Sequence, residues 1–71
     1  MRQREVEQRA GRSLNNFCRN TACGPSRLVK TQKLKNNRWL VDFETQNRLY
    51  TVMVDNGGNT EVSVWDKNPS R

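Results

Sequence analysis

Hydrophobic residues near the start of the chain recur at the spacing of a helix. Val6, Ala10, Leu14, Phe17 and Cys18 follow one another at intervals of four, four, three and one residues. Such spacing places side chains on one face of a helix. The pattern therefore predicts an N-terminal helix with a single apolar face.

Different residues mark the two ends of this helix. Gly24 can adopt the left-handed conformation that follows a helix, and Pro25 cannot continue one, so the helix is expected to end before them. Gly11 costs a helix about 1 kcal/mol relative to alanine, and Ser13 is a competent N-cap. The ordered helix is therefore expected to start as late as Leu14.

These limits define the expected domain organisation. Residues 1–11 are predicted to be a flexible or frayed segment. Residues 12–67 are predicted to form a single domain, because no second apolar cluster or internal repeat is present. Residues 68–71 are expected to be a loose tail.

From residue 27 onward, apolar and polar residues alternate with the period of a strand. A two-residue turn at 46–47 produces three apolar cross-strand pairs in one register, which chance rarely does. The pairs are Phe43 with Tyr50, Val41 with Val52, and Trp39 with Val54. A three-residue loop at 56–58, with a glycine for its left-handed position, extends the pattern. It pairs Val52 with Val62 and Tyr50 with Val64.

The first hairpin is expected to turn on Asn36 and Asn37, because asparagine tolerates the positive φ of two-residue turns. That turn would set Leu34 against Trp39. The predicted fold class is therefore α+β, with an N-terminal helix packed on a four-stranded antiparallel β-meander. The helix is expected to cover the sheet face that carries the paired residues above.

The same register leaves apolar side chains on the sheet face opposite the helix. They are Leu40, Leu49, Met53 and Trp65. An exposed apolar patch on a small protein usually marks a contact surface. The alternative is that the N-terminal segment or the tail covers it. Contact with a partner is the favoured hypothesis.

The net charge of +6 is concentrated in the front half of the chain. Between Glu7 and Asp42 there are eight basic residues and no acidic one, whereas three bases and five acids follow from Asp42 onward. This asymmetry favours an acidic partner. The basic residues that could contact phosphates are Arg12, Arg19, Arg27, Lys33, Lys35 and Arg38.

Two functions follow from these surfaces. The first is a small non-catalytic binding or adaptor protein that docks on an acidic protein, or on a copy of itself, through the face opposite the helix. The alternative is a nucleic-acid-binding domain that uses the basic segment 9–38, since basic and aromatic residues together can hold single strands. Trp65 would lie about 14 Å from Lys33, so the geometry only partly supports a site in which bases stack on Trp65 beside the basic residues.

The composition argues against other chemistry. The chain has no histidine and no Gly-rich phosphate loop, so we expect no enzyme activity, no catalytic residues, no cofactor and no small-molecule substrate. Two cysteines without histidine are too few for a structural zinc site within one chain. Cys18 and Cys23 are expected to be reduced thiols, with a disulfide as the alternative in an oxidising compartment. No apolar run is long enough for a membrane span or a signal core, so a soluble, cytoplasmic protein is expected.

Overall fold

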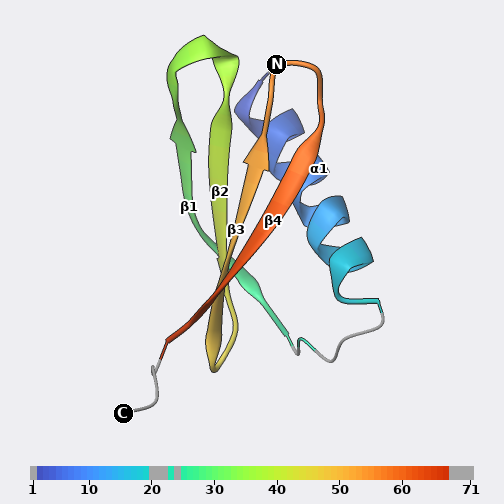
Figure 1. Cartoon of the computed structure of the whole chain (residues 1–71), viewed down its shortest axis with the longest axis vertical. Helices are drawn as coiled ribbons and strands as arrows, with labels where there is room; N and C mark the ends of the chain where they lie inside the picture. The colour runs from blue at the N-terminus through green and yellow to red at the C-terminus, as the bar shows by residue number, and fades with distance from the viewer. Residues whose placement is uncertain (1, 20–22, 24, 68–71) are drawn as a thin grey trace.

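The computed structural model describes residues 2–19, 23 and 25–67, and it consists of one helix against one side of a sheet (Figure 1). The elements in chain order are α1 (Gln3–Phe17), β1 (Arg27–Lys33), the 3₁₀ turn η1 (Lys35–Asn37), β2 (Trp39–Glu44), β3 (Arg48–Val54) and β4 (Thr60–Asp66). The four strands are antiparallel in the order β1-β2-β3-β4. The predicted α+β fold is therefore confirmed.

The five apolar pairs predicted for the last three strands are all present. Phe43 pairs with Tyr50, Val41 with Val52, Trp39 with Val54, Val52 with Val62, and Tyr50 with Val64. The backbone N–H of Thr45 donates to the carbonyl of Arg48 at 2.9 Å and closes the predicted two-residue turn. Gly58 has φ +86° and supplies the left-handed position of the last loop.

The first hairpin differs from the prediction by one residue. Lys33, not Leu34, pairs with Trp39, because the loop has three residues and Leu34 N–H donates to the carbonyl of Arg38 at 2.6 Å. Both turn asparagines do have positive φ, 63° and 58°. A one-residue shift moves side chains to the other face. Thr31 and Lys33 therefore face the helix. A bulge between Leu28 and Lys30 shifts the register once more, so that Leu28 faces the helix as predicted.

The helix also begins earlier than expected. It starts at Gln3, and Val6 and Ala10 are fully buried, so residues 3–11 are helical where a frayed segment was expected. Burying a valine side chain contributes about 1.5–3 kcal/mol, which exceeds the cost of about 1 kcal/mol for Gly11. The hydroxyl of Thr31 donates to Glu7 Oε2 at 2.6 Å and ties this part of α1 to β1.

The core lies between α1 and the sheet. Its members are Val6, Ala10, Leu14, Trp39, Val41, Phe43, Tyr50, Val52 and Val54. Val62 and Cys18 are only half-buried, and Phe17 and Val64, which the pattern also placed inside, are exposed. Phe17 and Val64 lie at the margins of the core, since Phe17 is the last residue of α1 and Val64 is on the edge strand β4. Within the described residues, no helix is long and apolar enough to cross a membrane.

Cys18 and Cys23 form a disulfide, with their Cα atoms 5.6 Å apart. The expectation of reduced thiols was therefore wrong. Both cysteines pack half-buried against the core just after α1 ends, which holds them within bonding distance. The sequence spacing alone permitted either state. Gly24, proposed as the helix stop, and the tail 68–71 lie outside the described residues.

Replacing Gly11 by alanine is expected to stabilise the protein by about 0.5–1 kcal/mol. Gly11 lies inside α1, and a Cβ added there would meet nothing within 4 Å. The melting temperature, followed by circular dichroism, should rise by about 4–8 °C per kcal/mol. Gly58→Ala is the control and should lower it, because the φ is positive and the Cβ would lie 3.0 Å from Arg9 Nη1. An unchanged or lower melting temperature for Gly11→Ala would contradict the prediction.

Candidate interaction surfaces

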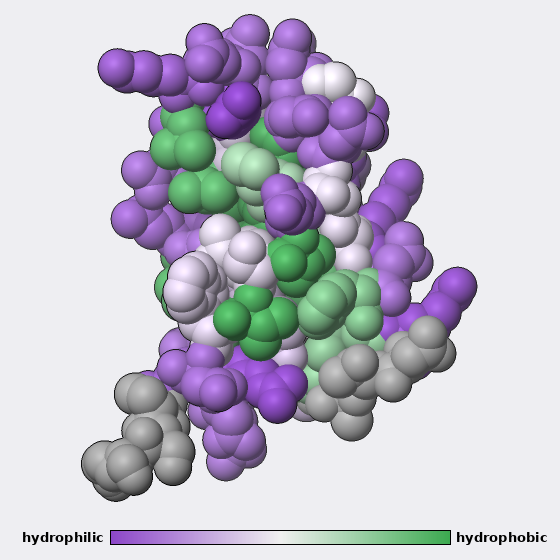
Figure 2. Space-filling view, in the orientation of Figure 1, coloured by the Kyte–Doolittle hydropathy of each residue, from purple (hydrophilic) through white to green (hydrophobic). Residues whose placement is uncertain are grey.

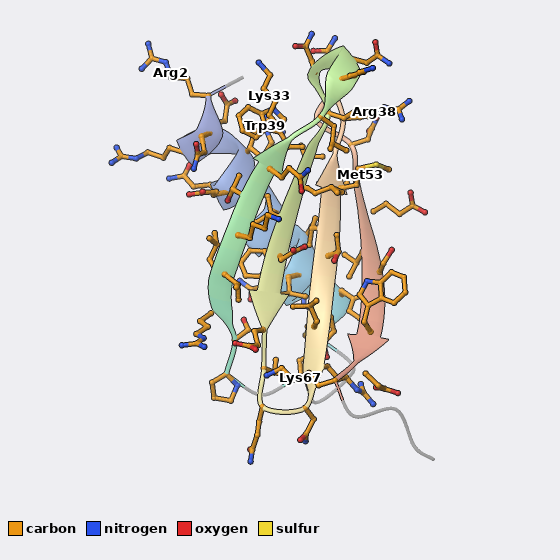
Figure 3. The ribbon with its side chains drawn as sticks, turned by 90° about the vertical axis from the view of Figure 1, so that its left-hand side faces the viewer. Arg2, Lys33, Arg38, Trp39, Met53 and Lys67 are labelled. Atoms are coloured by element: carbon orange, nitrogen blue, oxygen red, sulfur yellow. A yellow bond between two sulfur atoms is a disulfide. The ribbon has the colours of Figure 1, made fainter. Side chains whose placement is uncertain are left out.

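The sheet face opposite α1, called the open face below, carries three cross-strand rows of side chains. Figure 3 looks onto this face, with α1 behind the sheet. The row nearest the β1–β2 hairpin is Gln32, Leu40, Met53 and Glu61. The middle row is Lys30, Asp42, Thr51 and Ser63. The third row is Arg27, Glu44, Leu49 and Trp65. No described helix or strand packs over it, because the only described helix lies on the other side.

The four apolar residues predicted for this face lie on it, but as two separate pairs. Leu40 pairs with Met53 and Leu49 with Trp65. Rows are about 7 Å apart on one face, and the middle row is polar, with Thr51 Oγ1 donating to Asp42 Oδ1 at 3.0 Å. Trp65 is 58% exposed, whereas the other three are half-buried. Figure 2, which is turned 90° from the view of Figure 3, shows another side of the molecule, where hydrophobic residues also lie in groups with polar residues between them.

One end of the open face is held by a charged cluster around Glu44. This carboxylate accepts from Lys67 Nζ at 2.7 Å and from Arg27 Nη2 at 2.9 Å. The hydrogen bonds from Lys67 and then Arg27 hold the pKa of Glu44 below its usual value. Arg27, a candidate phosphate contact, is therefore already paired within the chain.

A hollow of about 490 Å³ adjoins this cluster. Its lining is Pro25, Ser26, Arg27, Glu44, Thr45, Gln46 and Lys67. Ligand pockets of this size are usually lined by apolar and aromatic side chains with a few polar groups. Here the lining has no aromatic residue, every lining residue except Pro25 is polar or charged, and the cations Arg27 and Lys67 are paired with Glu44.

The opposite end of the molecule is basic. Figure 3 shows Arg2, Lys33 and Arg38 there, and Lys35 lies in the hairpin between the last two. Lys33 Nζ lies 5.6 Å from the centre of the Trp39 ring, a cation–π contact. Trp39 is only 9% exposed and faces the core, so it offers no surface on which a base could stack.

Next to this end, the β3–β4 loop is organised by one carboxylate. Asp55 Oδ1 accepts from the backbone N–H groups of Asn59 and Gly57, each at 2.9 Å. These bonds, with that of Asn59 the largest, hold the pKa of Asp55 below its usual value, and Arg38 adds a small electrostatic contribution. The carboxylate is therefore engaged in holding the loop.

The six basic residues predicted as phosphate contacts do not form one surface. Arg12 and Arg19 lie on and after α1, the hairpin carries Lys33, Lys35 and Arg38, and Arg27 belongs to the charged cluster at the other end. Arg4 was not among the predicted contacts, although it is exposed on the helical segment that was expected to fray. Arg4 precedes Arg12 by eight residues, and this spacing indicates that the two lie on the same face of a helix.

The two carboxylates of the open face already have partners within the chain. Asp42 is hydrogen-bonded to Thr51, and Glu44 to two cations. Over residues 2–19, 23 and 25–67, no group of three or more metal-ligating side chains is close enough to hold an ion. No known protein family matches this chain, and no match was found among curated proteins or solved structures.

Proposed function

We propose that this protein is a non-catalytic binding domain that associates through its open face, and that the partner this face fits is a second copy of the chain. The observation that carries the proposal is the order of side chains across the strands. A two-fold axis parallel to the strands and midway between β2 and β3 places β1 over β4 of the second copy, and β2 over β3. Aligned sheets pack about 10 Å apart in this way.

The apolar row supports this arrangement. Leu40 on β2 and Met53 on β3 are cross-strand partners, so the axis exchanges their positions. Each Leu40 then lies over Met53 of the second copy, and each Met53 over Leu40. Such an interface is isologous, with the same contact made twice.

The two edges of the open face carry side chains that can pair across the axis. The open-face side chains of β1 include the cations Arg27 and Lys30, and those of β4 include Glu61 but no cation. The axis sets Arg27, whose side chain is 80% exposed, over the exposed ring of Trp65. Arginine over tryptophan is a favourable cation–π pair. In the first row, Gln32 lies over Glu61 and can donate to it.

The size of the face predicts a weak complex. Four strands of about seven residues cover roughly 19 by 24 Å, or about 450 Å² in projection. Stable interfaces bury about 800 Å² per partner. We therefore expect a dissociation constant between about 10 µM and 1 mM.

Sedimentation equilibrium up to about 1 mM protein tests the proposal. The unaltered protein should show a monomer–dimer equilibrium. Met53→Ala with Trp65→Ala should weaken it about tenfold or more, because aromatic and apolar contacts dominate interfaces. Leu28→Ala is the control, since Leu28 is 43% exposed but faces the other side of the sheet. A monomer at every concentration, or equal weakening by the control, would overturn the proposal.

An acidic protein partner is the second candidate for the same face, favoured by the net charge of +6. It becomes the better hypothesis where the protein stays monomeric. Cytoplasmic localisation stays a prediction, and the disulfide weighs against it, because such bonds persist in oxidising compartments.

A further inference from the structure

The solvent-facing side of α1 carries a stripe of polar residues that we call the arginine stripe. Its members are Arg4, Gln8, Arg12, Asn15 and Arg19. All five are exposed, and they follow one another at intervals of four, four, three and four residues. This is the spacing of one helix face, the one turned away from buried Val6, Ala10 and Leu14. Arg19 stands in the turn that follows the helix, where its N–H donates to Asn16.

No acidic side chain neutralises this stripe among the residues that the structure describes. Arg4, Arg12 and Arg19 form no ion pair there, whereas Glu5 is engaged by Arg9 at 3.5 Å. Glu7 is turned toward the sheet and accepts from Thr31, which with Gln3 holds the pKa of its carboxyl below the usual value. The stripe is therefore a surface of three uncompensated positive charges.

The residue types suit phosphate groups. Every basic residue from position 2 to position 19 is arginine, whereas β1 and its hairpin also carry lysines. Arginine presents a planar fork that matches phosphate oxygens with two parallel hydrogen bonds. The amides of Gln8 and Asn15, between the arginines, are further donors.

The length of the stripe fits an extended polyanion. Fifteen residues separate Arg4 from Arg19, which is about 22 Å at 1.5 Å per residue. One strand of a duplex carries a phosphate about every 3.4 Å along the axis, so the stripe spans about six phosphates. Arg4 also lies in the first turn of α1, where the helix dipole disfavours a cation, so an external anion would relieve that repulsion.

We propose that the arginine stripe binds the phosphate backbone of nucleic acid without regard to base sequence. This site lies on the opposite side of the molecule from the open face, and it does not depend on dimer formation. A face-to-face dimer would carry one stripe on each outer surface.

A salt titration with two triple variants tests the proposal. The probes are a duplex of about 20 base pairs and a single strand of the same length, in about 50–200 mM salt. Changing Arg4, Arg12 and Arg19 to glutamine keeps good helix formers. It should lower duplex affinity at least tenfold in about 50 mM salt and reduce the slope of log affinity against log salt by about three. Circular dichroism checks that α1 remains folded.

The control removes the same charge from the sheet side. Lys33, Lys35 and Arg38 are exposed, and none forms an ion pair with another described residue. Changing these three to glutamine should alter the slope by less than about one. Equal losses from both triples would mean that only net charge attracts nucleic acid, and a larger loss from the control would move the site to the hairpin. Either result overturns the proposal, as would equally tight binding of polyglutamate or no binding of either probe.

Discussion

Replacing Trp39 by alanine is expected to lower the free energy of unfolding by about 3–5 kcal/mol. Trp39 is buried between α1 and the sheet, pairs with Val54, and is covered on its outer side by Lys33. A 71-residue domain has a total stability of about 4–10 kcal/mol. The variant should therefore be partly or wholly unfolded at 25 °C, as followed by urea denaturation with circular dichroism.

Trp65→Ala is the matched control for this prediction. The residue type is the same, but Trp65 is exposed on the open face, so its removal should cost less than about 1 kcal/mol. Trp39→Ala thus tests the contribution of the core to folding, whereas Trp65→Ala tests the contribution of the open face to association. Similar losses of stability for both variants would contradict the assignment of Trp39 to the core.

Breaking the disulfide between Cys18 and Cys23 is expected to cost about 2 kcal/mol. The bond closes a short loop of about six residues, for which loop-closure entropy gives a value at the low end of the range for disulfides. The melting temperature should fall by about 8–16 °C in the presence of a reductant, since 1 kcal/mol corresponds to about 4–8 °C in a domain of this size.

A variant with both cysteines changed to serine provides the control for this experiment. It should melt at the temperature of the reduced protein, and adding reductant should not change it. Alkylation of the unreduced, denatured protein followed by mass spectrometry should label neither thiol. Two labelled thiols, or the same melting temperature with and without reductant, would contradict the prediction.

The sequence was sufficient for the parts of the fold in which several pairings agree. Three apolar pairs in one register determined β2 and β3, and a glycine suited to positive φ determined the last loop. The first hairpin had no such agreement, because β1 is an edge strand in which polar residues occupy both faces. A loop of two or three residues satisfied its pattern equally well. Only backbone pairing distinguishes them.

For the candidate surfaces, the sequence predicted which apolar residues share a face, but not their division into two pairs and not Arg4. The register placed Leu40, Leu49, Met53 and Trp65 on one face, and the structure has them there. Their division into two pairs follows from the strand order and the position of Thr51 in the middle row. Arg4 was missed for another reason. Propensity at Gly11 suggested a frayed start, whereas tertiary burial of the preceding turns keeps this segment helical.

The third residue of the β1–β2 loop and the bulge in β1 together add two residues between Leu28 and its partner Phe43. Cross-strand partners lie on the same face, so either insertion can be removed without changing the partner of Leu28. A shorter loop still closes on Leu34 and Arg38, and deletion of Val29 removes the bulge and leaves Leu28 opposite Phe43. In evolutionary terms the two insertions are independent. Descendants of this chain should therefore gain or lose each one alone, and a single-residue deletion in the loop should survive without a compensating change near Val29.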